Sequence, residues 1–579
     1  YQELYLHLED AVDYPSLPGV ARADAYSWSE FTRLVEAASR VGLRVVPIVN
    51  LLGHTQYLIK TPEWRDLNEL RGSDGSPLDR GQICPLHPRT LEVASRLLDD
   101  VAPLCTAGKV HVGLDESFHL GRHPLSRAEI AEVGLATHFA RYVQRLHGLA
   151  ATRRLRLGIW ADMLIFLRDA IPQLPPDLIA YDWYYHAFRR LPRVELFNFA
   201  EYDLATPLRA HGIEYWGCPM NGAFRFEPLP VFGERLANAT SWWRHGQRVG
   251  AAGFLVTSWE PYRLALPLTT VVDAAIASLW LEPPVDDHGA MLTRGFERVF
   301  GRDRARAAAR AALATDAYSF AGYARWEINQ RWDITPANAT LAPYERERRL
   351  HARLSLRPDL PLPLSASLAF RRYLAERDVF VRRAAKQVLN LRRALATRAR
   401  RNEKSSPLHR AVADMQAEAR AFAGALRAGR RAARAMWGLT RDRSAVGQNE
   451  TILAADAERL AQWRAWLRDL NRDPTTLDRP SPIVGAWQLQ FVVVNFAPAL
   501  SRVVVEQGQA DGTWQELQGR HTIEFRTVAA RPRANVRRAF VVSVDRPQKP
   551  LRLALRGVGQ VAITQVELTD GVSFRRPRN

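Results

Sequence analysis

The chain has 579 residues, enough for about three or four domains at roughly 150 residues each. Its formal net charge is +19, and only five of its 80 basic residues are lysine. The arginines are spread along the whole length and are not gathered with aromatic residues in one block, which argues against nucleic-acid binding. The three cysteines, Cys84, Cys105 and Cys218, lack metal-ligand spacing and are odd in number, so neither a zinc site nor a disulfide framework is predicted, and no run of about 18 apolar residues predicts a membrane span.

The beginning of the sequence predicts that a segment lies upstream. The chain starts at Tyr1, without Met and without a signal peptide, directly inside the strand-like run at residues 4–8. The compartment and the oligomeric state are therefore left open.

The first part of the chain alternates predicted strands and helices with a period near 40 residues. The strands are expected at residues 5–8, 43–50, 109–114, 155–160, 178–181, 212–216 and 252–258. Capping boxes at Ser27 and Ser126 predict helices that run to about Val41 and Leu149. Alternation of this kind favours parallel pairing with right-handed crossovers, so we expect an α/β fold, a (β/α)8 TIM-type barrel over residues 1–285 whose first strand and helix are missing upstream.

The rest of the chain changes character after Pro283 and Pro284. Residues 286–360 are helical and rich in Arg and Ala, and we read them as a helical extension of the barrel. Three long helical patterns predict a helical bundle domain over residues 361–478. Short alternating strands predict a β-sandwich domain over residues 479–579.

Every barrel strand whose end can be placed finishes in acidic, aromatic or histidine residues. They are Glu9, Asp10, His54, Asp115, Glu116, Trp160, Asp162, Asp182, Trp183, Tyr184, Tyr185, Trp216, Trp259 and Glu260. The carboxyl ends of barrel strands carry the active site in this architecture. A ring of Trp and Tyr with interspersed carboxylates suits a pyranose, because the apolar sugar face stacks on aromatic rings while hydroxyls need fixed acceptors. Adjacent strand residues point to opposite faces, so one of Tyr184 and Tyr185 should face the core.

The adjacent carboxylates Asp115 and Glu116 favour one kind of chemistry. Two carboxylates across a glycosidic bond give ordinary retaining or inverting hydrolysis, but neighbouring side chains at one strand end diverge. One could protonate the leaving oxygen while the other reaches a neighbouring substituent of the same sugar. If that substituent is a 2-acetamido group, its carbonyl oxygen can act as the internal nucleophile.

These residues resemble glycoside hydrolase family 20, the β-N-acetylhexosaminidases. H-V-G-L-D-E at residues 111–116 is similar to that family's H-x-G-x-D-E motif, and P-I-V-N-L-L-G-H at residues 47–54 is similar to its P-G-H region. W-A-D-M, D-W-Y-Y and W-E follow at later strand ends in the same order, and the whole resemblance covers about residues 1–281.

The resemblance implies an exo-acting enzyme that removes terminal GlcNAc or GalNAc without a metal or organic cofactor, with a carbohydrate as its partner. Glu116 would be the general acid/base, and Asp115 would orient the acetamido group. Trp160, Trp183 and Trp259 would wall the sugar pocket, Tyr184 or Tyr185 would donate to the acetamido oxygen, and His54, Asp162 and Glu260 would hold sugar hydroxyls or the catalytic acid. The family's sugar-binding Arg on the first strand has no counterpart here, nor does its tyrosine on strand seven, where Tyr215 and Trp216 stand.

Two alternatives stay open. One is a retaining glycosidase without the acetamido requirement, in which Glu260 would be the nucleophile. The other is a glycan-binding protein without catalysis.

Overall fold

The computed structural model describes the chain except for Arg80, Ala510 and the segments 189–202, 223–227, 260–264, 329–340, 402–407, 442–446, 479–480, 484–486, 496–498, 517–522, 528–535, 545–549, 559–560 and 571–579. The chain divides into two compact units. The first comprises the described residues of Tyr1–Pro192, Asn198–Pro219 and Ser241–Leu255, and the second comprises those of Met220–Thr240 and Val256–Asn579.

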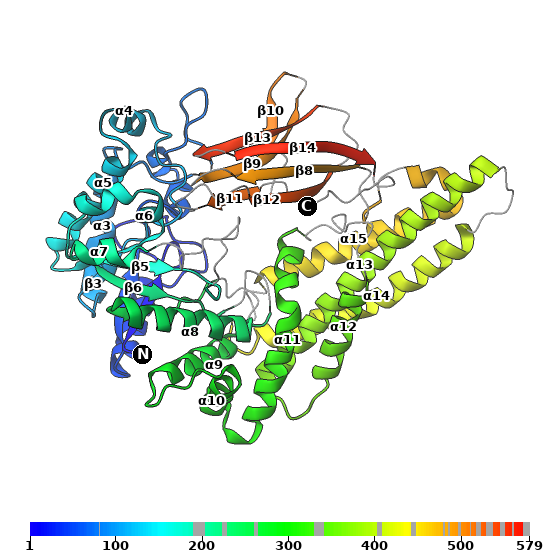
Figure 1. Cartoon of the computed structure of the whole chain (residues 1–579), viewed down its shortest axis with the longest axis horizontal. Helices are drawn as coiled ribbons and strands as arrows, with labels where there is room; N and C mark the ends of the chain where they lie inside the picture. Colours follow the sequence, from blue (N-terminus) through cyan, green and yellow to red (C-terminus); the bar gives the residue numbers. More distant parts are fainter. Residues whose placement is uncertain are drawn as a thin grey trace. The chain divides into compact units, whose positions relative to one another are not determined.

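The first unit is built on a seven-stranded parallel sheet whose strands neighbour one another in chain order (Figure 1). They are β1 (Glu3–His7), β2 (Arg44–Ile48), β3 (Lys109–His111), β4 (Arg156–Trp160), β5 (Ile179–Trp183), β6 (Glu214–Cys218) and β7 (Gly253–Phe254). The number and order of the predicted strands are confirmed, and the sheet with its helices forms a partial TIM-type barrel. Among the described residues no pairing joins β1 to β7.

Helices connect the strands of this sheet. They are α1 (Trp28–Arg40), α2 (Gln56–Ile59), α3 (Thr90–Val101), α4 (Pro124–Val133), α5 (Leu135–Ala151), α6 (Asp162–Phe166), α7 (Ala205–Ala210) and α8 (Phe232–Val249), with short 3-10 turns at Arg65–Leu67, Ala102–Leu104 and Arg168–Gln173. A strand of a barrel is covered by helices on its outer face and by packed side chains on its inner face, and β2 accordingly carries Val45, Val46 and Ile48 at 3% exposure or less.

A local sequence signal explains where α1 begins, whereas a second predicted signal does not hold. Ser27 caps α1 as predicted, since its hydroxyl accepts the Glu30 N–H while the Glu30 carboxylate accepts the Ser27 N–H. The capping box predicted at Ser126 is wrong: α4 starts at Pro124 with His123 as its N-cap, and the Ser126 hydroxyl instead donates to Glu69. The single helix predicted there is two helices, because Gly134, at a φ of 83°, separates α4 from α5.

Aromatic side chains from different strands fill the interior of the sheet. The hydroxyls of Tyr5 and Tyr181 are 2.7 Å apart. The ring of Tyr181 lies 5.3 Å from that of Trp216 and 4.8 Å from that of His111, which in turn lies 4.4 Å from the ring of Trp160. This layer of packed rings makes the centre of the unit a core and not a pore.

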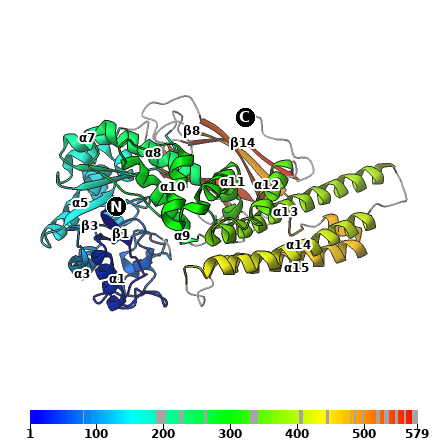
Figure 2. The ribbon, with the colours of Figure 1, turned by 90° about the horizontal axis from the view of Figure 1, so that it is seen from below.

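The second unit contains a helical stretch and two sheets. Its helices are α9 (Leu266–Ile276), α10 (His288–Phe300), α11 (Arg302–Ile328), α12 (Ala342–Leu354), α13 (Leu362–Arg401), α14 (Leu408–Trp437) and α15 (Gly447–Arg472), with 3-10 turns at Ala277–Trp280 and Pro474–Asp478. The long helices α13, α14 and α15 lie side by side (Figures 1 and 2). A buried Asp456 carboxylate joins α15 to α13, because it accepts hydrogen bonds from Arg377 and Tyr373.

The strands of the second unit are antiparallel. They are β8 (Trp487–Asn495), β9 (Ala499–Gly508), β10 (Trp514–Glu516), β11 (Ile523–Thr527), β12 (Val536–Val544), β13 (Leu551–Val558) and β14 (Val561–Asp570). One sheet contains β10, β9, β11 and β13, and the other has the order β12, β8, β14. The packing of these sheets as a sandwich, and the four-domain division, stay predictions. In the part of the chain that the structure describes, no helix is long and apolar enough to cross a membrane.

Candidate active site

The acid pair and a histidine meet at the carboxyl ends of neighbouring strands. Asp115 and Glu116 follow β3, and His54 follows β2. His54 Nε2 lies 3.2 Å from Asp115 Oδ2 and 3.5 Å from Glu116 Oε2. The exposed fraction of the side chain is 41% for His54, 15% for Asp115 and 28% for Glu116, so a ligand can reach all three. The predicted strand-end cluster is therefore present for these residues.

The backbone around the acid pair is held in an unusual conformation. Leu114, Glu116 and His54 have φ values of 77°, 50° and 55°, in the left-handed region that non-glycine residues rarely occupy. Each such residue costs about 1–3 kcal/mol unless the surrounding structure holds it, and such residues cluster at functional sites. Gly113, at φ 72°, precedes them, and a Cβ there would lie 2.1 Å from Asn50 Oδ1. The turn that presents the two carboxylates is thus strained and closely packed.

The charge of His54 lies between the two carboxylates. Burial by itself lowers the pKa of His54, but the carboxylates of Asp115 and Glu116 outweigh burial and raise that pKa from 6.5 to about 11. His54 is therefore an imidazolium at neutral pH, and its positive charge offsets the repulsion between two carboxylates that are adjacent in sequence.

Asp162 fixes the backbone of the acid pair from the next strand. It is fully buried at the start of α6, directly after β4, and its Oδ2 accepts the N–H of Glu116 at 3.0 Å. A charged acceptor makes a stronger hydrogen bond than a neutral one. Asp162 therefore contacts the peptide of Glu116, as a support for the site from within the protein.

A second polar group lies behind the cluster, at the end of β1. The side-chain amide of Asn50 donates to Glu9 Oε1 at 3.0 Å and lies 2.8 Å from His7 Nε2. Burial lowers the pKa of His7, although the charges of Glu9 and Asp115 oppose this effect. The sequence analysis missed His7 and Asn50. Their positions at the ends of the first two strands are the signal that could have found them.

Asp10 lies apart from this group. Its carboxylate pairs with Lys60, and Arg22 Nη1 lies 4.0 Å away. The structure therefore shows Asp10 in a surface ion-pair network of the loop after β1.

Strand β5 ends in residues that alternate between two environments. The rings of Trp183 and Tyr185 stack with centroids 5.1 Å apart, and both side chains are half-buried. Tyr184 is 4% exposed and faces the core, and its carbonyl accepts the indole N–H of Trp242. The prediction that one of the two tyrosines faces the core is confirmed, and Trp183 and Tyr185 form an aromatic platform.

Asp182 faces away from that platform. It is 1% exposed and accepts a hydrogen bond of 2.7 Å from the hydroxyl of Tyr215. Burial raises the pKa of Asp182 from 3.8 to about 7, although the hydrogen bond from Tyr215 opposes part of this rise. The structure thus places Asp182 in the interior, with Tyr215 as its partner.

The remaining predicted tryptophans lie in different places. Trp160 is 2% exposed and packs against His111 and Tyr181. The indole N–H of Trp216 donates to Glu214, and its ring lies under the ammonium of Lys109. Glu214 and Lys109 are the first residues of β6 and β3, so the ring of Trp216 lies toward the opposite end of the strands from the acid pair. Trp259 is half-buried in the second unit. Glu260 lies outside the described residues.

No metal-binding arrangement was found in the described part of the chain, where no three or more His, Cys, Asp or Glu side chains are grouped to hold an ion. The cysteines Cys84, Cys105 and Cys218 are free and buried.

Comparisons with known proteins show what part of this chain is similar to. Residues 7–187 match the model described as "Glycosyl hydrolase family 20, catalytic domain". Human Hexosaminidase D is 24% identical over 298 residues, which cover 48% of this chain and 57% of the human protein. Bovine Hexosaminidase D is 27% identical over 126 residues, 21% of this chain and 35% of the bovine protein. The chain therefore spans little more than half the length of the human relative.

Two solved structures of glycosidases are similar to part of this chain. A Streptomyces plicatus beta-hexosaminidase mutant in complex with the product GlcNAc has a TM-score of 0.36 at 15% identity, over 52% of this chain and 63% of that one. A Flavobacterium johnsoniae chitobiase has a TM-score of 0.38 at 12% identity, over 72% and 70% of the two chains. The assignment rests on the sequence match, whose segment contains His54, Asp115, Glu116 and Asp162. By that match, residues 7–187 are similar to the catalytic domain of glycosyl hydrolase family 20.

Proposed function

We propose that this protein is an exo-acting β-N-acetylhexosaminidase that removes terminal GlcNAc or GalNAc by substrate-assisted, retaining catalysis. The observation that carries the proposal is the pair of carboxylates at one strand tip, Asp115 and Glu116, in contact with a single histidine nitrogen. The match of residues 7–187 to the family 20 catalytic domain and the similarity to Hexosaminidase D support a hexosamine glycoside as the substrate.

The position of the pair favours substrate assistance over a protein nucleophile. An ordinary retaining enzyme needs two carboxylates that flank the scissile bond on opposite sides of the sugar. Asp115 and Glu116 leave the same strand tip, and their contacting oxygens lie 3.2 and 3.5 Å from the same nitrogen. Both therefore approach a bound sugar from one side, and the 2-acetamido group of the substrate can supply the nucleophile that the pair does not.

In the first step Glu116 donates its proton to the glycosidic oxygen as the C1–O bond breaks. The acetamido carbonyl oxygen attacks C1 and forms a cyclic oxazolinium-like intermediate. The Asp115 carboxylate accepts the acetamido N–H and offsets the positive charge that develops there. His54 carries a positive charge 3.5 Å from Glu116 and stabilises the Glu116 carboxylate once the proton has left.

In the second step the Glu116 carboxylate takes a proton from a water molecule as the water oxygen attacks C1. The bond between C1 and the acetamido oxygen breaks, which opens the oxazolinium ring and releases the sugar with its configuration retained. The hydrogen bond from the Glu116 N–H to Asp162 keeps the acid in place through both steps. The stacked rings of Trp183 and Tyr185 offer an apolar surface for the sugar face, and the Tyr185 hydroxyl is the candidate donor to the acetamido oxygen.

The test compares four aryl glycosides: the β-N-acetylglucosaminide, the β-N-acetylgalactosaminide, the plain β-glucoside and the plain β-galactoside. We expect cleavage of the acetamido sugars only, and a loss of about 10²-fold or more in kcat for Asp115→Asn. Glu116→Gln should lose a similar factor with a methyl leaving group and much less with a dinitrophenyl leaving group, which departs without a proton.

Glu132→Gln, an exposed glutamate on α4, is the matched control and should keep full activity. Equal cleavage of the plain glycosides would refute substrate assistance and favour a separate nucleophile. Binding of N-acetylhexosamine without cleavage by the wild type would favour a glycan-binding protein.

A further inference from the structure

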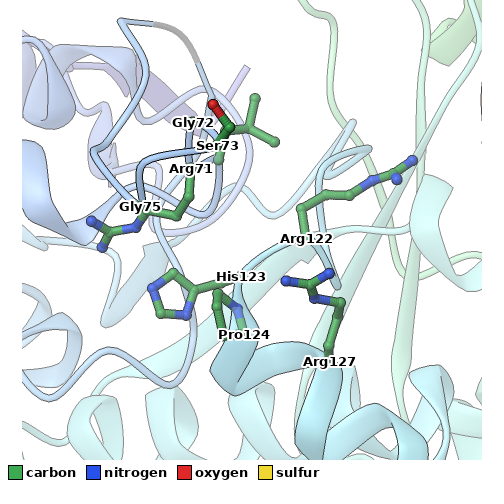
Figure 3. A pocket seen from close by; sticks show the side chains of 9 residues that line it. Arg71, Gly72, Ser73, Gly75, Arg122, His123, Pro124 and Arg127 are labelled. Atoms are coloured by element: carbon green, nitrogen blue, oxygen red, sulfur yellow. The ribbon is translucent and has the colours of Figure 1, made fainter.

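A basic pocket lies next to the segment that carries the acid pair. It has a volume of about 450 Å³ and is lined by the loop after Glu69 and by the start of α4. Its charged side chains are Arg71, Arg122 and Arg127, with His123 between them. Figure 3 shows Arg122 and Arg127 together on one side of the pocket and Arg71 with His123 on the other. None of the residues that we place in catalysis lines it.

Two of the three arginines carry charge that no described group neutralises. Arg122 and Arg127 are exposed, and among the described residues neither has an ion pair. Arg71 is different, because its Nη1 lies 2.6 Å from Asp66 Oδ1, although its buried Nε has no hydrogen-bond partner. The carboxylate of Asp74, in the same loop, is occupied by Ser76. The pocket therefore has an excess of positive charge.

The histidine adds a hydrogen-bond donor and no charge. His123 Nδ1 accepts the Leu125 N–H at 3.2 Å, which leaves the proton of the neutral ring on Nε2. Burial lowers the pKa of His123, and the charge of Arg71 acts in the same direction. Since the Leu125 N–H is already occupied and Pro124 has none, recognition of a ligand depends on the side chains and not on the end of the helix.

The frame of the pocket is rigid. The fully buried Glu69 carboxylate accepts the N–H groups of Gly121, Arg122 and His123 at 2.7, 2.8 and 3.2 Å and the Ser126 hydroxyl at 3.0 Å. These bonds fix the backbone from which Arg122 projects. The planar guanidinium group of an arginine is suited to a planar or tetrahedral anion.

A short stretch of chain joins the acid pair to the pocket. Arg122 is six residues after Glu116 along the chain, so their Cα atoms are at most about 21 Å apart. An exo-acting enzyme holds one sugar at the acid pair and leaves the rest of the glycan to extend outward over the loops. A volume of about 450 Å³ suits one charged sugar or substituent and not a macromolecule.

We propose that this pocket binds an anionic group, a sulfate ester or a carboxylate, on the sugar that follows the cleaved N-acetylhexosamine, with Arg122 and Arg127 as its ligands. The inference rests on the proposed function and adds the class of substrate: acidic glycans are preferred over neutral ones. Guanidinium groups bind both anions through paired N–H donors, so the two sources share one recognition chemistry.

The test uses six disaccharides, in which GlcNAc is β-linked to glucose, to glucuronate or to glucose 6-sulfate, each in 1,3 and in 1,4 linkage. We expect a KM about fivefold or more lower for an acidic disaccharide than for the neutral one, with a similar kcat. The advantage should shrink between about 0.05 and 0.5 M salt, because these arginines are exposed. The acid with the lower KM identifies the source of the anion.

Arg122→Gln and Arg127→Gln should each remove about two- to fivefold of the advantage, and the double variant should remove it. Both should leave kcat/KM for the neutral disaccharide unchanged. Arg33→Gln, an exposed arginine on α1, is the matched control and should behave as the wild type. Inorganic sulfate should raise the KM of the acidic substrate and leave that of the neutral one unchanged.

Each other outcome overturns one claim. Cleavage of acidic and neutral disaccharides with equal KM, or an advantage that survives in the double variant, overturns the pocket and leaves the proposed function standing. Cleavage of none of them and of neither aryl β-N-acetylhexosaminide, in a protein that still unfolds cooperatively, overturns the proposed function and with it the assignment of the pocket to a leaving-group sugar.

Discussion

Gly53 leaves no room for a side chain beside the acid pair. A Cβ at this position would lie 1.8 Å from the carbonyl oxygen of Asp115 and 3.3 Å from the hydroxyl of Ser117. The nearest obstacle is backbone, which cannot rotate away as the end of a side chain can. Gly53→Ala must therefore push the Asp115 peptide away, and it moves His54, the next residue in the chain, as well.

The size of the effect follows from this overlap. Overpacking of a closely packed site costs about 1–3 kcal/mol, which corresponds to a fall of about 2–10 °C in the thermal midpoint of a unit of this size. A displacement of about 1 Å in a catalytic group costs about 10²-fold in rate, or about 2.7 kcal/mol of activation free energy. We expect the loss to be mainly in kcat, because the carboxylates and not the aromatic platform would be displaced.

The assay is hydrolysis of the aryl β-N-acetylglucosaminide, with thermal denaturation in parallel. Gly148→Ala in α5 is the control, since its Cβ would meet nothing within 4 Å and alanine favours a helix. It should keep its activity and be equally or slightly more stable. A Gly53→Ala protein with wild-type kcat and an unchanged midpoint would refute the argument that this contact fixes the acid pair.

Two further predictions concern buried carboxylates. Asp162→Asn should lower kcat about fivefold with little change in KM, because the Glu116 N–H would keep an acceptor but lose a charged one. In steady-state assays Asp162→Ala should lower kcat further, and an equal loss of kcat in both variants would contradict this role. The pKa of Asp182 is about 7 in the folded state and 3.8 ordinarily, so the folded state retains a proton that the unfolded state releases, and stability should fall as pH rises between these values. Asp182→Asn should flatten this slope and raise the free energy of unfolding at pH 7 by at most about 4 kcal/mol. Thermal denaturation from about pH 4 to 8 measures the slope, and the same slope in both proteins would contradict the prediction.

The order of the barrel could be predicted from sequence because its signals are local. A continuous apolar run such as residues 43–50 is the pattern of a strand covered on both faces, and a capping box such as that at Ser27 satisfies free N–H groups within one turn. The helix boundaries at Ser126 and Gly134 could not be predicted in this way. Ser126 follows the capping pattern, but its hydroxyl donates to Glu69, 57 residues earlier in the chain.

The sequence by itself determined the seven strands, their order, the adjacent Asp115 and Glu116 at a strand end and the histidine that follows the neighbouring strand. Each of these depends on hydrophobic periodicity or on the rule that parallel strands end at one edge. Only the tertiary structure decided which strand-end residues meet. In the tertiary structure His54 Nε2 lies beside both carboxylates and Asp182 is buried against Tyr215. The ring of Trp216 contacts Glu214 at the beginning of its own strand. The reason is that a side chain's environment is set by partners far away in the chain, and sequence spacing contains no record of them.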